Sequence, residues 1–187
     1  MFGNSKPGFT LFEILVAMAI IGIMATFIVP NLQRASHDRK LFFAQLNALV
    51  QYGKQHAIMS NKVQQVLFDF KANTIQLLQE GTQKDSTGQL KYEPVQSVAG
   101  NTLVAIPDAI EIKNFYIDGT GFDEMAKYAG RKTGTLWFYI VPEGLAQEAI
   151  INVVDTKDLM YDGKPRQFGL VLNPFAVQFK EYDAFQK

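Results

Sequence analysis

Hydrophobic and polar positions divide the chain into three parts, and the first part is the most apolar. Between residues 9 and 29 almost every side chain is apolar, and Glu13 carries the single charge. As a helix, these 21 positions span roughly 30 Å, the thickness of a bilayer's hydrocarbon core. The run therefore predicts a transmembrane helix over residues 9–30. A carboxylate in such a helix is costly unless it is paired, so Glu13 is a functional candidate.

The second part is predicted to be an amphipathic helix over residues 31–61. Apolar residues recur there at spacings of three and four, which is typical of a helix with one apolar face. Pro30 removes one backbone hydrogen bond, and we expect it to kink the helix rather than end it. Together the two parts hold about 50 residues, or roughly 75 Å of helix. The apolar positions are Leu32, Ala35, Phe42, Phe43, Leu46, Leu49, Val50, Gly53 and Ala57, and the polar positions between them include Gln33, Asp38, Lys40, Gln45, Asn47, Gln51 and Lys54.

The third part, residues 62–187, is predicted to be a β-rich globular domain. Its residues alternate with period two in short runs that are separated by turn residues. Seven or eight strands after one helix indicate an α+β fold with an antiparallel sheet, on which the apolar face of the helix packs. Residues 80–101 are polar, and we expect a surface loop with at most a short strand near 90–92. Residues 122–131 are compatible with a short helix. The expected strands are 63–70, 74–79, 102–106, 110–117, 135–141, 149–154, 167–172 and 175–182, and the expected turns are 71–73, 118–121, 142–144 and 162–165.

Composition narrows the function without identifying it. The 18 basic and 18 acidic residues balance, so the net charge gives no indication of a nucleic-acid partner. The chain has no cysteine, which excludes a disulfide framework and a thiolate metal site. The apolar run is too long for a secretory signal peptide, and residues 30–34 do not form a small-residue cleavage site. Basic residues on both sides of the run leave the membrane orientation undecided by charge alone.

Several chemically capable residues have simpler interpretations. Ser36, His37 and Asp38 are consecutive on a helix, so they point in different directions and cannot form a catalytic relay. His56 lies near the helix end, where a surface or capping role is the default. The sequence has no Gly-rich phosphate loop, nucleophile elbow or His-Glu metal motif. We therefore expect no enzyme activity and no cofactor.

Two further groups of charged residues lie in expected loops. Asp155, Asp158 and Asp162 supply oxygen atoms, but their spacing does not fit an EF-hand, and we expect no metal. Two basic pairs, Arg131-Lys132 and Lys164-x-Arg166, are interpreted as solvated loop residues, so we expect no nucleic acid.

Residues 6–13, Lys-Pro-Gly-Phe-Thr-Leu-Phe-Glu, carry a specific resemblance. They resemble the processing signal of the type IV pilin superfamily, which includes the pseudopilins of type II secretion. That signal has a short leader ending in glycine, a phenylalanine that becomes methylated, and a glutamate at the fifth mature position. The resemblance implies a pilin-like fold, in which a long N-terminal helix packs on a C-terminal antiparallel sheet domain. It also places the leader, residues 1–8, in the cytoplasm and the residues beyond Pro30 in the periplasm.

The resemblance also assigns roles to Gly8, Phe9 and Glu13. A prepilin peptidase in the inner membrane would cut between Gly8 and Phe9 and methylate the new Phe9 amine. Glu13 lies one helical turn from Phe9, so a neighbouring subunit's amine can pair with it after an axial shift. Pairing removes two costly charges from hydrocarbon together and favours assembly. The simpler alternative is that Glu13 reaches the membrane interface by itself.

Two later stretches indicate a branch of the family. Residues 56–63 resemble the Ala-Ile-x-x-Asn/Arg passage of H-type minor pseudopilins and related minor pilins, and residues 137–144 resemble their late strand and turn. The implied partners are the prepilin peptidase, other major and minor pseudopilins, the inner-membrane assembly platform and membrane lipid. Two alternatives remain: a minor pilin of a type IV or competence pilus, and a single-pass membrane protein that forms no fibre.

Overall fold

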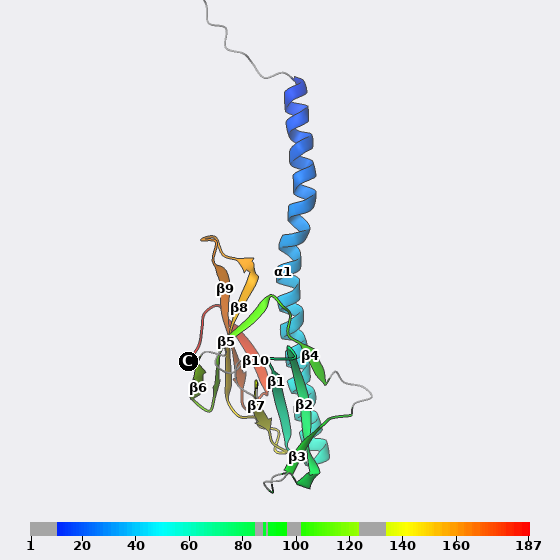
Figure 1. Ribbon diagram of the computed structural model, residues 1–187, viewed down its shortest axis with the longest axis vertical. Coiled ribbons are helices and arrows are strands. Elements are labelled where there is room, and N and C mark those ends of the chain that lie inside the picture. Colours follow the sequence, from blue (N-terminus) through cyan, green and yellow to red (C-terminus); the bar gives the residue numbers. More distant parts are fainter. Residues whose placement is uncertain (1–10, 85–87, 89, 97–101, 124–133) are drawn as a thin grey trace, which may run out of the picture.

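One long helix, α1 (Leu11–Ser60), forms the spine of the protein and extends far beyond the β-rich domain at its N-terminal end (Figure 1). The computed structural model describes residues 11–84, 88, 90–96, 102–123 and 134–187, with the side chains of 25–37 and 120–123 excepted. The helix continues through Pro30, so proline does not end it, as expected. It ends at Ser60, whose hydroxyl donates a 2.6 Å hydrogen bond to the carbonyl of His56, and Asn61 follows at φ 51°. Asparagine tolerates this left-handed conformation, which stops the helix at the predicted boundary.

The first sheet contains the hairpin predicted around residues 71–73. Asp69 faces Thr74 across the turn, and the Asp69 carboxylate accepts the backbone N–H groups of Lys71 and Ala72 at 2.9 and 3.0 Å. Asn73 completes the turn with φ 51°. The strand order is β3-β2-β1-β7, with β4 also paired to β2, and every pairing is antiparallel. Its strands are β1 (Gln64–Asp69), β2 (Thr74–Lys84), β3 (Leu90–Pro94), β4 (Leu103–Ala105) and β7 (Thr135–Ile140).

The second sheet is also antiparallel throughout, with strand order β10-β9-β8-β5-β6. Within the described residues the domain thus holds ten strands in two sheets, more than the seven or eight predicted. Figure 1 shows the β8–β9 hairpin running beside α1 towards its N-terminal half. The strands are β5 (Ile110–Ile117), β6 (Thr120–Asp123), β8 (Ala149–Leu159), β9 (Pro165–Asn173) and β10 (Gln178–Tyr182).

The two sheets and the C-terminal half of α1 share one hydrophobic core. The rings of Phe68 on β1 and Phe115 on β5 pack edge to face, with 5.0 Å between their centroids, and this contact joins the two sheets directly. Phe138 on β7 makes a similar edge contact with Phe179 on β10 at 6.1 Å. The predicted apolar face of the helix is confirmed within the described side chains, because it supplies Phe42, Leu46, Leu49, Val50 and Ala57 to this core.

The prediction of a loop over residues 80–101 is wrong for most of the residues that the structure describes there. Residues 80–84 continue β2, and β3 pairs with them, with Glu80 opposite Tyr92. The glycine that suggested a loop has a packing role instead. A Cβ at Gly81 would lie 2.6 Å from the carbonyl oxygen of Lys91, so only glycine lets the strands approach this closely.

Several further boundaries differ from the prediction, and among them β8 continues to Leu159 and β9 begins at Pro165. Asp118 and Gly119, with φ of 47° and 75°, form a two-residue hairpin turn, so residues 120–123 belong to β6 and not to a turn or helix. Residues 124–131 lie outside the described part of the chain. The last strand begins at Gln178 and not at residue 175, because the Asn173 side chain accepts the N–H groups of Phe175 and Ala176 at 2.9 Å each and folds this segment into a turn.

The predicted turn over residues 142–144 is confirmed. The N–H of Gly144 donates to the carbonyl of Val141 at 2.9 Å, with Pro142 and Glu143 at the two central positions. A Cβ at Gly144 would lie 3.0 Å from Ile58, so this turn sits close to the C-terminal end of α1.

Tyr92 gives the β3 edge a measurable pH dependence. Burial raises the pKa of Tyr92 to about 12, and the nearby Tyr139 and Glu80 add to the rise. The unfolded chain loses this proton near pH 10, so the contribution of Tyr92 to stability is complete below about pH 10 and is lost as the pH rises through about 12. An ultraviolet titration should show one late-titrating tyrosine that is missing in Tyr92→Phe. Its persistence in Tyr92→Phe would contradict this assignment.

Candidate assembly site

The N-terminal part of α1 presents an unusually apolar surface to its surroundings. Every side chain from residue 11 to residue 24 is exposed. Covering one large apolar side chain gains about 1.5–3 kcal/mol, so this segment has a strong drive to enter a membrane or to pack on other helices. Its large apolar residues are Leu11, Phe12, Ile14, Leu15, Val16, Met18, Ile20, Ile21, Ile23 and Met24.

Glu13 is the single charged residue of this segment and lies in the first turn of α1. A carboxylate there is favoured by the positive end of the helix dipole. The predicted partners in processing, Gly8 and Phe9, lie outside the described residues, so their relation to Glu13 stays a prediction. Gly22 leaves a gap on the same part of the helix, with no atom within 4 Å of a Cβ placed there. Such a gap allows another helix to approach closely.

Pro30 marks the boundary between the two halves of α1. The backbone is helical on both sides of it, and the kink stays a prediction. In the described residues, no helix meets the length and hydropathy expected of a membrane span.

A row of polar side chains fastens the C-terminal half of α1 to the edge of the second sheet. The Asn47 side chain accepts the Phe179 N–H at 2.7 Å and donates to the Phe179 carbonyl at 3.3 Å, as a neighbouring strand would. Gln51 donates to the carbonyls of Ala176 and Val177 at 2.9 and 3.0 Å, and Lys54 donates to that of Phe175 at 2.8 Å. This row was not predicted, although the spacing of positions 47, 51 and 54 places them on one helix face.

Asn47→Ala is expected to lower the free energy of unfolding by about 1–3 kcal/mol, because the Phe179 N–H and carbonyl lose their partner in a partly buried place. Urea unfolding of the full chain in detergent measures the change. Gln55→Ala is the matched control, since Gln55 is exposed on the same helix and should change stability by less than about 0.5 kcal/mol. Equal effects of the two substitutions would contradict the fastening role of Asn47.

Arg39 ties α1 to the β8–β9 hairpin. Its guanidinium lies 3.1 Å from the Asp158 carboxylate and 3.8 Å from that of Glu181, and it stacks over the Phe168 ring at 5.6 Å. Arg166 approaches the same Asp158 carboxylate at 2.9 Å. The Arg39 side chain is only 11% exposed, so this contact is better shielded from water than a surface ion pair.

Contacts with the protein itself occupy the three aspartates that were considered as a cation site, Asp155, Asp158 and Asp162. Asp155 does not lie in a loop but is buried in β8, where its carboxylate accepts the N–H groups of Lys157 and Asp158 at 3.0 and 3.1 Å. Asp162 pairs with Lys164 at 3.2 Å. Among the described residues, no group of three or more potential ligands is arranged to hold a metal ion.

The remaining candidates do not form a second site. The His56 ring lies 5.9 Å from that of Tyr52, and no described group hydrogen-bonds its buried Nδ1. Lys164 and Arg166 form ion pairs with acidic side chains. The described part of the structure does not include the side chains of Ser36 and His37 or the Arg131-Lys132 pair.

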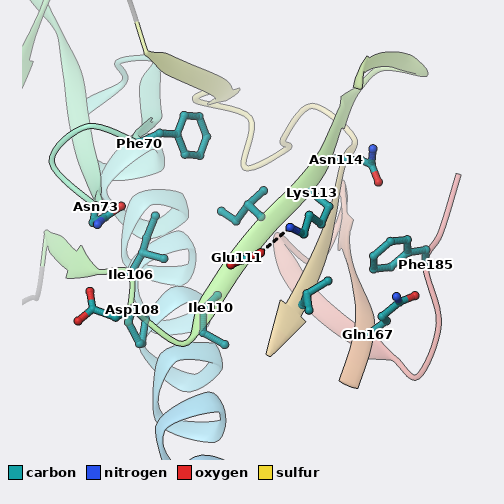
Figure 2. A pocket seen from close by; sticks show the side chains of 13 residues that line it. Phe70, Asn73, Ile106, Asp108, Ile110, Glu111, Lys113, Asn114, Gln167 and Phe185 are labelled. Atoms are coloured by element: carbon teal, nitrogen blue, oxygen red, sulfur yellow. Dashed lines mark hydrogen bonds and ion pairs between the residues drawn. The ribbon is translucent and has the colours of Figure 1, made fainter. Parts of the chain in front are cut away.

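An open cleft lies between the β1–β2 turn, β5 and the C-terminal segment (Figure 2). Its walls are largely apolar, and the charged residues Glu111 and Lys113 pair with each other at its rim. The described residues that line it include no serine, cysteine or histidine, and their carboxylates are those of Asp108 and Glu111.

One comparison with known proteins agrees with the processing signal. Residues 3–29 match the family model described as the prokaryotic N-terminal methylation motif, a range that contains Gly8, Phe9 and Glu13. No curated protein sequence matches the chain. Two solved structures of the minor pseudopilin EpsH from the type II secretion system of Vibrio cholerae are similar to it. The first is 12% identical, with a TM-score of 0.49 over 82% of this chain and 98% of that one. The second is 11% identical, with a TM-score of 0.46 over 81% of this chain and 93% of that one.

Proposed function

We propose that this chain is a minor pseudopilin of a type II secretion system, closest to the H-type, and that it is a structural subunit of a fibre. One observation carries the proposal. The methylation motif leads directly into an exposed apolar helix, whose other half is fastened to a β-rich domain. This arrangement suits a subunit that is stored in a membrane by its helix and is then packed by the same helix against its neighbours.

Processing would create a charge that can pair with Glu13 of a neighbouring subunit. Cleavage after Gly8 leaves a cationic amine on Phe9, and methylation keeps it cationic. In hydrocarbon, a lone amine and a lone carboxylate are each costly. A neighbouring subunit that is shifted along the axis by one helical turn brings its Phe9 amine level with Glu13, and both charges are then compensated. The assembled state is thus favoured over the isolated subunit.

The proposed location follows from the same motif. Residues 1–8 are a cytoplasmic leader that the prepilin peptidase removes, residues 9–30 anchor the chain in the inner membrane of a Gram-negative bacterium, and residues 31–187 lie in the periplasm. The exposure of the large apolar side chains between residues 11 and 24 supports the anchor. The assembly platform and the other pseudopilins would be its partners, and assembly would help to move folded proteins across the outer membrane.

The H-type assignment has a runner-up with the same fold, a minor pilin of a type IV or competence pilus. The turn that follows β7 supports both, because Pro142, Glu143 and Gly144 adopt the geometry that the family resemblance predicts. Deletion of the gene, followed by complementation, separates them. The proposal predicts that the deletion strain loses exoprotein secretion and keeps twitching motility and DNA uptake. Loss of motility or transformation with normal secretion would favour the runner-up.

A further inference from the structure

The β8–β9 hairpin carries an apolar group at its tip, which we define as residues 159–164. Leu159, Met160 and Tyr161 are consecutive and exposed, and Tyr161 is as open as a side chain in an extended peptide. The turn that presents them is well formed. The N–H of Met160 donates to the carbonyl of Lys164 at 2.8 Å, and the N–H of Gly163 donates to that of Met160 at 2.9 Å. A hydrogen-bonded turn therefore holds three large apolar side chains outside the core.

The hairpin tip points along α1 towards its apolar half (Figure 1). Its height along the helix is fixed by Arg39, which holds Asp158 at 3.1 Å. About three residues separate Asp158 from the end of the turn, so the tip reaches roughly 10 Å beyond Arg39 at a strand rise of about 3.3 Å per residue. On a helix with a rise of 1.5 Å per residue, roughly 10 Å corresponds to six or seven residues. Measured along the helix axis, the hairpin tip is therefore level with a point only two or three residues beyond Pro30.

We propose that the hairpin tip rests in the headgroup layer of the membrane that holds the N-terminal half of α1. This inference rests on the proposed membrane anchor over residues 9–30. The headgroup region extends about 5–8 Å beyond the hydrocarbon core on each side, and the tip falls within that distance of Pro30. The apolar surface of α1 and the apolar tip are thus neighbouring parts of one membrane-facing surface.

The chemistry of the hairpin tip suits an interface between lipid and water. Tyrosine is enriched at that depth because its ring is apolar and its hydroxyl remains hydrated. Leu159 and Met160 supply further exposed apolar area beside Tyr161. The ion pair of Asp158 with Arg39 keeps the hairpin attached to the helix, and the pair of Asp158 with Arg166 joins the two strands of the hairpin. A second contact with the membrane would oppose tilting of the domain relative to the bilayer and so would fix the height at which it meets the next subunit.

Single-cysteine probes test this contact, because the chain has no native cysteine. The full chain would be placed, one copy per disc, in nanodiscs of phosphatidylethanolamine and phosphatidylglycerol that contain a lipid with a nitroxide on its headgroup. A fluorophore on Lys164→Cys reports on the tip, and one on Met18→Cys reports on the anchor. A third on Glu143→Cys reports on the opposite end of the domain, next to the C-terminal end of α1.

The expected result is strong quenching at positions 18 and 164 and little at 143. The combined substitution Leu159→Ser, Met160→Ser and Tyr161→Ser should remove most of the quenching at 164 and leave that at 18 unchanged. Equal quenching at 164 with and without these serines would overturn the proposal. So would shielding of position 164 that appears only when two chains share a disc, because a neighbouring chain would then cover the tip. Absence of quenching at position 18 would overturn the membrane anchor itself, and with it the proposed function.

Discussion

Glu13→Ala is expected to leave cleavage after Gly8 intact and to exclude the chain from the assembled fibre. The substitution removes the carboxylate that would compensate a neighbouring subunit's Phe9 amine in hydrocarbon. Removing one member of a buried ion pair costs roughly 3–5 kcal/mol, so incorporation should fall by about a hundredfold or more. Cross-linking followed by purification of the fibre from the membrane measures incorporation, and the loss of the leader is scored in the same sample.

Two further variants make the Glu13 experiment specific. Glu13→Gln keeps the shape of the side chain and removes its charge, so it should be excluded from the fibre as well. Glu143→Ala removes an exposed carboxylate at the opposite end of the domain and should assemble normally. Recovery of Glu13→Ala in the fibre at the wild-type level would show that the pairing with Phe9 is wrong.

Phe138→Ala is expected to lower the free energy of unfolding of the β-rich domain by about 3–5 kcal/mol. Phe138 is fully buried, and its ring contacts that of Phe68 at 6.3 Å in the first sheet and that of Phe179 at 6.1 Å in the second. Its removal opens a cavity where the two sheets meet. Urea unfolding of the full chain in detergent, followed by circular dichroism, measures the change.

Phe175→Ala is the matched control for Phe138, because it removes the same side chain from a position that is 74% exposed. Its effect should be within about 0.5 kcal/mol of zero. If Phe138→Ala proves no more destabilising than Phe175→Ala, the two sheets do not share one core.

The features with strong local signals could be predicted from the sequence. The helical period of the apolar residues between positions 42 and 57 is unbroken, and it correctly predicted which side chains pack on the sheets. The β5 strand matches the predicted residues 110–117, because turn residues follow it directly. The methylation motif was recognisable because its residues occur in a fixed order over a short stretch.

The features that depend on distant residues could not be predicted. Arg39 and Asp158 are 119 residues apart, so no local pattern shows that they pair. The sequence places Asn47 on the polar face of the helix, whereas its side chain accepts a hydrogen bond from the N–H of Phe179 on β10, 132 residues away. The sequence of the β2–β3 extension resembles a loop because a two-stranded extension needs little apolar alternation. Gly81 is a common loop residue, but here it allows the two strands to approach closely.

Mass spectrometry of the N-terminus of the chain, isolated from membranes of its native host, tests the central claim most directly. The proposed function predicts that residues 1–8 are absent and that the chain begins with an N-methylated Phe9. An intact Met1, or cleavage at any other bond, would contradict the assignment to a pilin-like fibre.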